Sequence, residues 1–306
     1  MKVITSKANL VEYDKTLLND LKTATFILTR FNLHLYSKNK VNDDVQTEEW
    51  LKNRFNLFEC YCLPSVANQN EEDFIWLCCF DENTPLDYRI KILEYKNNCR
   101  QFFPLFFNAD ETLNYVSILL NIIKDLKDES KFLTTIRLDN DDALRYNFIQ
   151  QVNSIRKRQL DNNIIYSFKS GIQYFKDYEI ATKIKYPDNH FLVLISIDYN
   201  EELTDKTILS FRHDLIRQFP YPFVILEDFP PMWIEVIHSS NVANDVKKNL
   251  CNGLVINMAS LIKKYNIVLT GIGSNNIIKV LYSFIFKLLP HYLAWYSRKI
   301  LNKIKL

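Results

Sequence analysis

The sequence contains few of the residues that mark fibrous, low-complexity or disulfide-bonded proteins. Its 306 residues include 4 glycines and 9 prolines, and no segment recurs at the spacing of about 20–50 residues that repeat proteins show. Hydrophobic residues make up 47% and charged residues 24%, which is typical of a chain that buries a full core in water. We therefore expect an ordinary globular protein.

The six cysteines lack the spacing of a disulfide framework or a zinc site. Cys60 and Cys62 are one residue apart, Cys78 and Cys79 are adjacent, and no histidine lies near either pair. We expect small buried side chains in a reducing compartment. The opening stretch MKVITSKANLVEYDK has no apolar core of the kind that a signal peptide needs, so the expected location is the cytoplasm.

The alternation of short apolar runs with segments of helical spacing predicts an α/β fold. Strands are expected at 24–31, 74–81, 132–138, 191–198 and in two stretches of 222–238. Helices are expected at 48–63, 84–98, 111–127 and 143–156, and a hairpin over 163–175 is expected to turn at Ser170 and Gly171. In open α/β sheets, ligands bind beyond the carboxyl ends of the strands.

Three aspartates lie where the strand expected at 132–138 ends. Asp139, Asp141 and Asp142 fall within four positions, before a helix expected to start at Ala143. One interpretation is that Asp141 or Asp142 caps this helix. A cap needs only one aspartate, however, and three carboxylates repel one another unless a cation offsets their charge. The cluster leaves both a helix cap and a metal or phosphate site open.

Five segments stand out in chain order. They are FILTRFN (26–32), WLKNRFNLFECYCLPS (50–65), FIWLCCFDENTP (74–85), TTIRLDNDDAL (134–144) and PMWIEVIHSSNVAN (231–244). Together they resemble the nucleotide-diphosphosugar glycosyltransferases of the GT-A fold, and more closely a bacterial family named for rhamnosyltransferases. The resemblance implies an α/β, GT-A-like (Rossmann-like) domain over 24–275, with a mixed central sheet flanked by helices. An N-terminal arm (1–23) would precede it and a helical tail (276–306) would follow.

The resemblance also implies the reaction. A sugar would move from a nucleotide-diphosphate donor to a glycan acceptor in bacterial surface polysaccharide synthesis. The family name suggests rhamnose, and a galactose or galactofuranose donor is as plausible. A metal-dependent nucleotidyl- or phosphotransferase would use the same aspartates. A nucleic-acid-binding protein is a weaker alternative, because the first 276 residues have a net charge of −4 and contain no recognised binding motif.

In the family resembled, the last aspartate of D-x-D binds a divalent cation that bridges the two phosphates of the donor. The first aspartate approaches the ribose or the water shell of the cation. These roles fall on Asp141 and Asp139, and His238 matches the position of a further ligand, the alternative being a buried structural histidine. Oxygen ligands suit Mg²⁺ or Mn²⁺, which would stabilise the nucleoside diphosphate as it leaves.

The resemblance and the strand ends also indicate where the donor binds. The residues expected there are Arg30, Asn32, Asp81, Arg137, Asp139, Asp142 and Trp233. The guanidinium of Arg30 suits a phosphate or a base, and it suits an ion pair with an aspartate equally well; Arg137 has the same two interpretations. Asp81 either contacts the nucleoside or caps the following helix. Trp233 either lines the sugar pocket or belongs to the core.

The catalytic base remains open in the sequence. An inverting transferase needs a carboxylate within hydrogen-bond reach of the acceptor hydroxyl, whereas retaining chemistry needs none. Asp228, Glu227 and Glu235 are the candidates near His238, and Asp142 is another. The resemblance weakens Glu235, because an amide is common at that position in the family, and residues 226–228 equally suit a solvated turn.

The last thirty residues, 277–306, carry six basic side chains and no acidic one. Apolar residues at 277, 281, 284, 285 and 288 mark one helical face, Pro290 ends it, and a second basic segment contains Trp295 and Tyr296. The apolar runs are shorter than the ~20 residues of a spanning helix. The pattern favours a peripheral helix on the inner face of the membrane, near a lipid-linked acceptor, or a packed helix with a solvated basic face.

Overall fold

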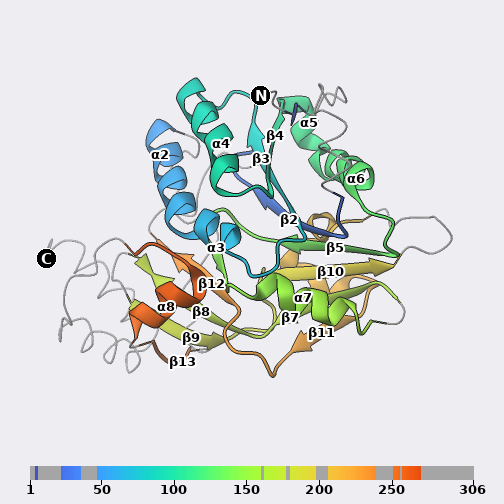
Figure 1. The fold of residues 1–306 in the computed structure, drawn as a ribbon, viewed down its shortest axis with the longest axis vertical. Helices are drawn as coiled ribbons and strands as arrows, with labels where there is room; N and C mark the ends of the chain where they lie inside the picture. The colour runs from blue at the N-terminus through green and yellow to red at the C-terminus, as the bar shows by residue number, and fades with distance from the viewer. Residues whose placement is uncertain are drawn as a thin grey trace, which may run out of the picture.

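The computed structural model describes residues 4–5, 22–35, 47–159, 162–176, 180–197, 206–238, 251–255 and 257–269. Helices cover both faces of a central sheet, and a second, smaller sheet lies beside it (Figure 1). The basic tail expected over 276–306 and most of the N-terminal arm lie outside the described residues. Within the described part of the chain, no helix combines the length and the apolarity needed to cross a membrane.

The central sheet has eight strands in the order β1-β4-β3-β2-β5-β10-β7-β11. Their bounds are β1 Ile4–Thr5, β2 Thr25–Arg30, β3 Ile75–Asp81, β4 Phe102–Phe107, β5 Phe132–Arg137, β7 Ile164–Phe168, β10 Leu192–Ile197 and β11 Phe223–Leu226. All neighbours are parallel except β10, which is antiparallel to β5 and to β7. The mixed sheet expected from the sequence is confirmed. The amino end of β10 therefore meets the carboxyl ends of the other strands at one edge.

Apolar residues on both faces of this sheet explain the helical layers. On one face lie α2 (Glu48–Leu57), the π-helical segment η1 (Phe58–Cys62), α3 (Leu63–Ala67), α4 (Leu86–Asn98) and α7 (Phe148–Arg156). On the other lie α6 (Tyr115–Leu126), η3 (Ile208–Ser210) and η4 (His213–Gln218), and α5 (Ala109–Leu113) precedes α6. The adjacent Cys78 and Cys79 of β3 belong to opposite layers. Cys60, Cys62, Cys78, Cys79 and Cys99 are free and buried, as expected.

The second sheet has five strands in the order β13-β9-β8-β12-β6. Their bounds are β6 Ala143–Leu144, β8 Ser170–Phe175, β9 Ile180–Lys185, β12 Trp233–Ile237 and β13 Cys251–Leu254. Side chains of α8 (Met258–Tyr265) pack in the core of this sheet. Because β6 follows β5 after only a short loop, the aspartates connect the two sheets.

Two sequence predictions are wrong in their details. No hairpin turns at Ser170 and Gly171: β7 belongs to the central sheet, β8 to the second one, and β8 pairs with β9 and β12. The segment after the aspartates is not helical from Ala143, because β6 comes first and α7 begins at Phe148. Strand β4 was not predicted. Its Pro104 argues against a paired strand, yet its outer neighbour β1 is only two residues long.

Candidate active site at the aspartate loop

The four residues of the loop between β5 and β6 differ in exposure. The side chain of Asp139 is 29% exposed, whereas Asn140, Asp141 and Asp142 are buried. The helix-cap interpretation of Asp141 or Asp142 is therefore excluded, since α7 starts several residues later with Asn147 as its cap. Each of the three carboxylates instead has a cationic partner from another part of the chain, which offsets the cost of burying it.

Asp139 is held by two arginines at the open side of the loop. Nε and Nη2 of Arg137 donate to its two carboxylate oxygens at 3.3 and 3.2 Å, and Nη2 of Arg30 lies 3.8 Å away. Burial disfavours the charged carboxylate, but the positive charges of Arg137, His190 and Arg30 outweigh it and hold the pKa of Asp139 well below its usual range. Asp139 is therefore ionised, and it is the most exposed carboxylate of the loop.

Asp142 forms a fully buried pair with His190. Its Oδ2 lies 2.6 Å from Nε2 of His190, and its Oδ1 accepts from the backbone N–H of Val236 at 2.9 Å. Burial and the charge of Asp141 raise the pKa of Asp142 to about 7. Burial opposes protonation of His190, but the hydrogen bond and charge of Asp142, with Asp139 nearby, raise the pKa of the imidazole. The pair therefore retains a proton between its two members near neutral pH.

Asp141 points to a different set of partners. Its Oδ2 lies 2.7 Å from Nη1 of Arg54 on α2 and 3.0 Å from Nε2 of His238. The same Nη1 donates to Oδ1 of Asn140 at 3.1 Å, and Nδ2 of Asn140 donates to the carbonyl of Phe31 at 2.7 Å. The structure places Asp141 beside His238, the two residues expected from the sequence to ligate a cation with Asp139. The loop is fixed through them to α2 and to the end of β12.

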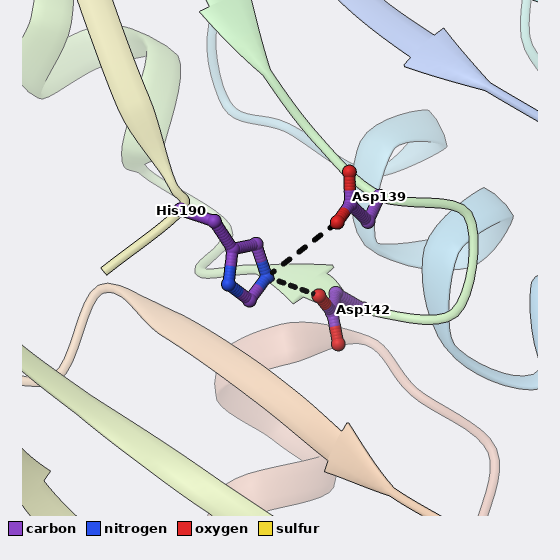
Figure 2. Close-up of side chains that lie close together, drawn as sticks. All are labelled: Asp139, Asp142 and His190. Atoms are coloured by element: carbon purple, nitrogen blue, oxygen red, sulfur yellow. Dashed lines mark hydrogen bonds and ion pairs between the residues drawn. The ribbon is translucent and has the colours of Figure 1, made fainter. Parts of the chain in front are cut away.

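A divalent cation has one compact donor group at this loop. Among the described residues, the ligand atoms of Asp139, Asp142 and His190 lie within 4.8 Å of one another (Figure 2). Two carboxylates and an imidazole are donors that Mn²⁺ accepts, although the cation would have to displace the proton between Asp142 and His190. The ligand set expected from the sequence also contains Asp139, but its other members are Asp141 and His238 in place of Asp142 and His190. Because Asp141 already pairs with the positive charge of Arg54, a cation would meet less negative charge at that set.

Asn32 and Asp81 join the ends of β2 and β3. Oδ1 of Asn32 accepts from the backbone N–H of Asp81 at 3.1 Å, and its Nδ2 donates to Oγ1 of Thr84 at 3.0 Å. Oδ1 of Asp81 accepts from the N–H of Asn83 at 2.6 Å, and its Oδ2 lies 3.3 Å from Nε2 of His34. Asp81 therefore stabilises the turn before α4. Both residues lie at the same edge of the sheet as Arg30.

Trp233 is fully buried where the two sheets meet. Its Nε1 donates to the carbonyl of Phe168 at 2.8 Å, and its ring stacks on Phe191 with centroids 4.6 Å apart. A Cβ atom on Gly171 would lie 2.3 Å from the indole, so only glycine permits this approach. The structure thus places Trp233 in the position of the core interpretation, 0% exposed.

The three candidate bases occupy different environments. Glu227 and Asp228 follow β11 and are exposed, with Oε1 of Glu227 2.7 Å from Nζ of Lys169. Because β11 is parallel to β7, they lie at the edge of the sheet that also carries the aspartate loop. Glu235 is buried on β12 and accepts from Nε2 of Gln173 at 2.7 Å. Only Glu227 and Asp228 are open to a large acceptor.

Sequence reasoning missed four residues of the cluster: Arg54, Asn140, His190 and His213. Nη1 of Arg137 lies 3.0 Å from Nδ1 of His213, and the rings of His190 and His213 are 6.0 Å apart between centroids. His190 precedes a strand, and a site at the amino end of a strand is found only when that strand is known to be antiparallel. Arg54 lies inside the quoted segment 50–65 and offered a signal, as a charged residue on the apolar face of a helix.

A family model described as "Putative rhamnosyl transferase" matches residues 28–249. No curated protein matches the chain. The structure of TarS 1–349 from S. aureus aligns with a TM-score of 0.39 and 11% identity, over 70% of this chain and 60% of that one. The same fragment in complex with UDP aligns with a TM-score of 0.34 and 12% identity, over 70% of this chain and 60% of that one. A "putative nucleotide-diphospho-sugar transferase" from Desulfovibrio desulfuricans G20 aligns with a TM-score of 0.33 and 9% identity, over 72% of this chain and 83% of that one.

Proposed function

We propose, since this chain belongs to the family described as "Putative rhamnosyl transferase", that it transfers a sugar from a nucleotide-diphosphate donor to a glycan acceptor. Its α/β, GT-A-like fold, with a mixed sheet between helices, is the one expected from the sequence. Rhamnose is the sugar that the family name suggests, and galactose or galactofuranose is as plausible. Bacterial surface polysaccharide is the proposed destination.

One observation carries the proposal. Arg30, Arg137 and the partly exposed Asp139 meet at the edge of the sheet where the strands β2 and β5 end. Open α/β sheets bind nucleotides beyond this edge. The guanidinium of Arg30 is partly exposed and suits a phosphate oxygen, while Arg137, whose Nε and Nη2 donate to Asp139, would hold that carboxylate and add positive charge. The diphosphate of the donor is proposed to lie here, with Asn32 and Asp81 on the side of the nucleoside.

A divalent cation, Mn²⁺ or Mg²⁺, fits the carboxylates of this loop. Asp139 would hold it, together with Asp142 and His190 or with Asp141 and His238. When bound, such an ion offsets the negative charge that develops on the departing nucleoside diphosphate. The arginines would act on the same charge from the protein side, because Asp139 holds the guanidinium of Arg137 in place and Arg30 lies beside it.

The acceptor is proposed to approach from the side of β11. Its hydroxyl must lose a proton as it attacks, and in inverting chemistry a carboxylate at hydrogen-bond distance takes that proton. Asp228 and Glu227 are exposed at this edge, whereas Glu235 would need an opening in the packing around β12. A lipid-linked acceptor would connect this side to the proposed membrane contact of residues 277–306.

Incubation with dTDP-rhamnose, UDP-galactose and UDP-galactofuranose, followed by product identification, tests the proposal. A transferase releases the sugar and the nucleoside diphosphate by breaking the sugar–phosphate bond, even when water replaces the acceptor. Cleavage between the two phosphates would instead support the alternative, a metal-dependent nucleotidyl- or phosphotransferase. The family match and the two arginines beside Asp139 support the transferase.

A further inference from the structure

We infer that His213 is a further substrate-binding residue: its Nε2–H donates a hydrogen bond to an oxygen of the donor diphosphate. The inference rests on the proposed function and extends it to a segment, 206–218, in which neither the D-x-D motif nor the other quoted motifs lie. His213 begins η4 and is half-buried. It contacts Arg137, which also holds Asp139.

The contact with Arg137 fixes which nitrogen of the imidazole carries the proton. Nη1 of Arg137 lies 3.0 Å from Nδ1 of His213, and a guanidinium can only donate. Nδ1 must therefore accept with its lone pair. A neutral imidazole with a free lone pair on Nδ1 has its hydrogen on Nε2, so the second nitrogen is a donor.

The backbone before η4 places this donor at the edge of the central sheet. The backbone N–H of Ile208, in η3, donates to Oγ1 of Thr135 on β5 at 2.9 Å. The T-shaped contact with His190, which itself pairs with Asp142, fixes the ring from the other side. His213, Asp139 and Arg30 are each partly exposed at this edge.

The N–H of His213 favours a negatively charged oxygen as its hydrogen-bond acceptor. An N–H beside two guanidinium groups is matched by an oxygen that carries negative charge, and a diphosphate supplies several such oxygens within reach of one another. A purely structural histidine would only hold Arg137 in place. The two roles use different nitrogens and can be separated by substitution.

His213→Asn and His213→Gln separate them. Asparagine places an oxygen near the position of Nδ1 and keeps an acceptor for Arg137, but it lacks the outer donor. Glutamine reaches the position of Nε2 with an N–H. Asp214→Asn is the matched control, because Asp214 is exposed on the same turn and pairs with Arg212. Binding of UDP, dTDP and GDP to the full-length variants is measured by calorimetry with Mn²⁺, beside thermal unfolding.

We expect His213→Asn to weaken binding of the best of these nucleotides about tenfold or more, as the loss of a hydrogen bond to a charged acceptor requires. His213→Gln should stay within about threefold of wild type, and Asp214→Asn should be unchanged. Equal binding by His213→Asn and the wild type would overturn the inference and leave the proposed function standing. If the wild type binds none of the three nucleotides, the proposed function fails and the inference fails with it.

A measurement on the wild type guards against variants that do not fold. Nitrogen-15 NMR of the histidine side chains should show that the ring of His213 is neutral with its hydrogen on Nε2. The Nε2 resonance should shift when the nucleotide that binds in calorimetry is added. A hydrogen on Nδ1, or a signal that does not respond to the nucleotide, would overturn the inference.

Discussion

Oδ2 of Asp141 lies 2.7 Å from Nη1 of Arg54, and both side chains are buried. This pair connects the aspartate loop to α2 across 87 positions of the chain. Asp141 lies in the loop that follows β5. Because it is buried with Arg54 and His238, substitution affects both the site and the stability of the fold.

Arg54→Met should lower the free energy of unfolding by about 3–5 kcal/mol, because it leaves the charge of Asp141 buried with one partner fewer. In an Asp141→Asn background the same change should cost clearly less. Denaturant unfolding of the four proteins measures the coupling. Arg100→Met is the control, since Arg100 and Glu72 form an exposed pair whose loss should cost less than about 1 kcal/mol. Additive costs of Arg54→Met and Asp141→Asn would contradict the account.

Asp139 belongs to both possible ligand sets of the cation. Asp139→Asn should therefore weaken Mn²⁺ binding, followed by electron paramagnetic resonance, at least tenfold. His190→Asn and His238→Asn then identify the set, because only the histidine that ligates the ion should change the affinity strongly. Mn²⁺ binding that is unaffected by all three substitutions would exclude the aspartate loop as the metal site.

The exposed carboxylates after β11 are predicted to serve the acceptor. If Asp228 is the base, Asp228→Asn should lower kcat by about 10²–10⁴ and leave the binding of the donor unchanged. Glu227→Gln is the neighbouring comparison, and Glu235→Gln the buried one. Steady-state kinetics with a glycan acceptor gives the three values. Full activity in all three variants would indicate retaining chemistry or a base elsewhere.

The basic segment 277–306, outside the described residues, is predicted to bind anionic membranes. A chain that ends near Ile272 should keep its affinity for the nucleotide, because the motifs lie upstream. It should no longer co-sediment with anionic vesicles, and binding by the full chain should weaken as salt screens its lysines. A full-length protein that stays in the supernatant at low salt would make this segment a packed element instead.

The strands of the central sheet could be predicted where both faces are buried. The run 74–81 is continuous in apolar residues because Cys78 and Cys79 face opposite helical layers. The strand β4 could not be predicted, because a proline such as Pro104 usually interrupts a strand. The prediction of a helix from Ala143 was wrong because the pairing of β6 with β12 overrides the local helical pattern.

The aspartates of the site could be located because they end a recognisable strand. Two of their partners could not, since Arg54 and His190 are 87 and 48 positions away from Asp141 and Asp142. The amino end of β10 lies at the site only because this strand runs antiparallel, and an apolar run carries no sign of its direction. The pairing of these carboxylates with Arg54 and His190 is therefore a tertiary property.

The most direct test of the account compares sugar release from nucleotide sugars by the wild type, Asp139→Asn and Asp188→Asn. Asp188 is an exposed carboxylate that pairs with Arg217. We predict that the wild type and Asp188→Asn break the sugar–phosphate bond at similar rates. Asp139→Asn should do so at least a hundredfold more slowly while still folded, although its melting temperature should fall because the buried guanidinium of Arg137 loses its carboxylate partner. Full activity of Asp139→Asn, or cleavage between the phosphates by the wild type, would contradict the account.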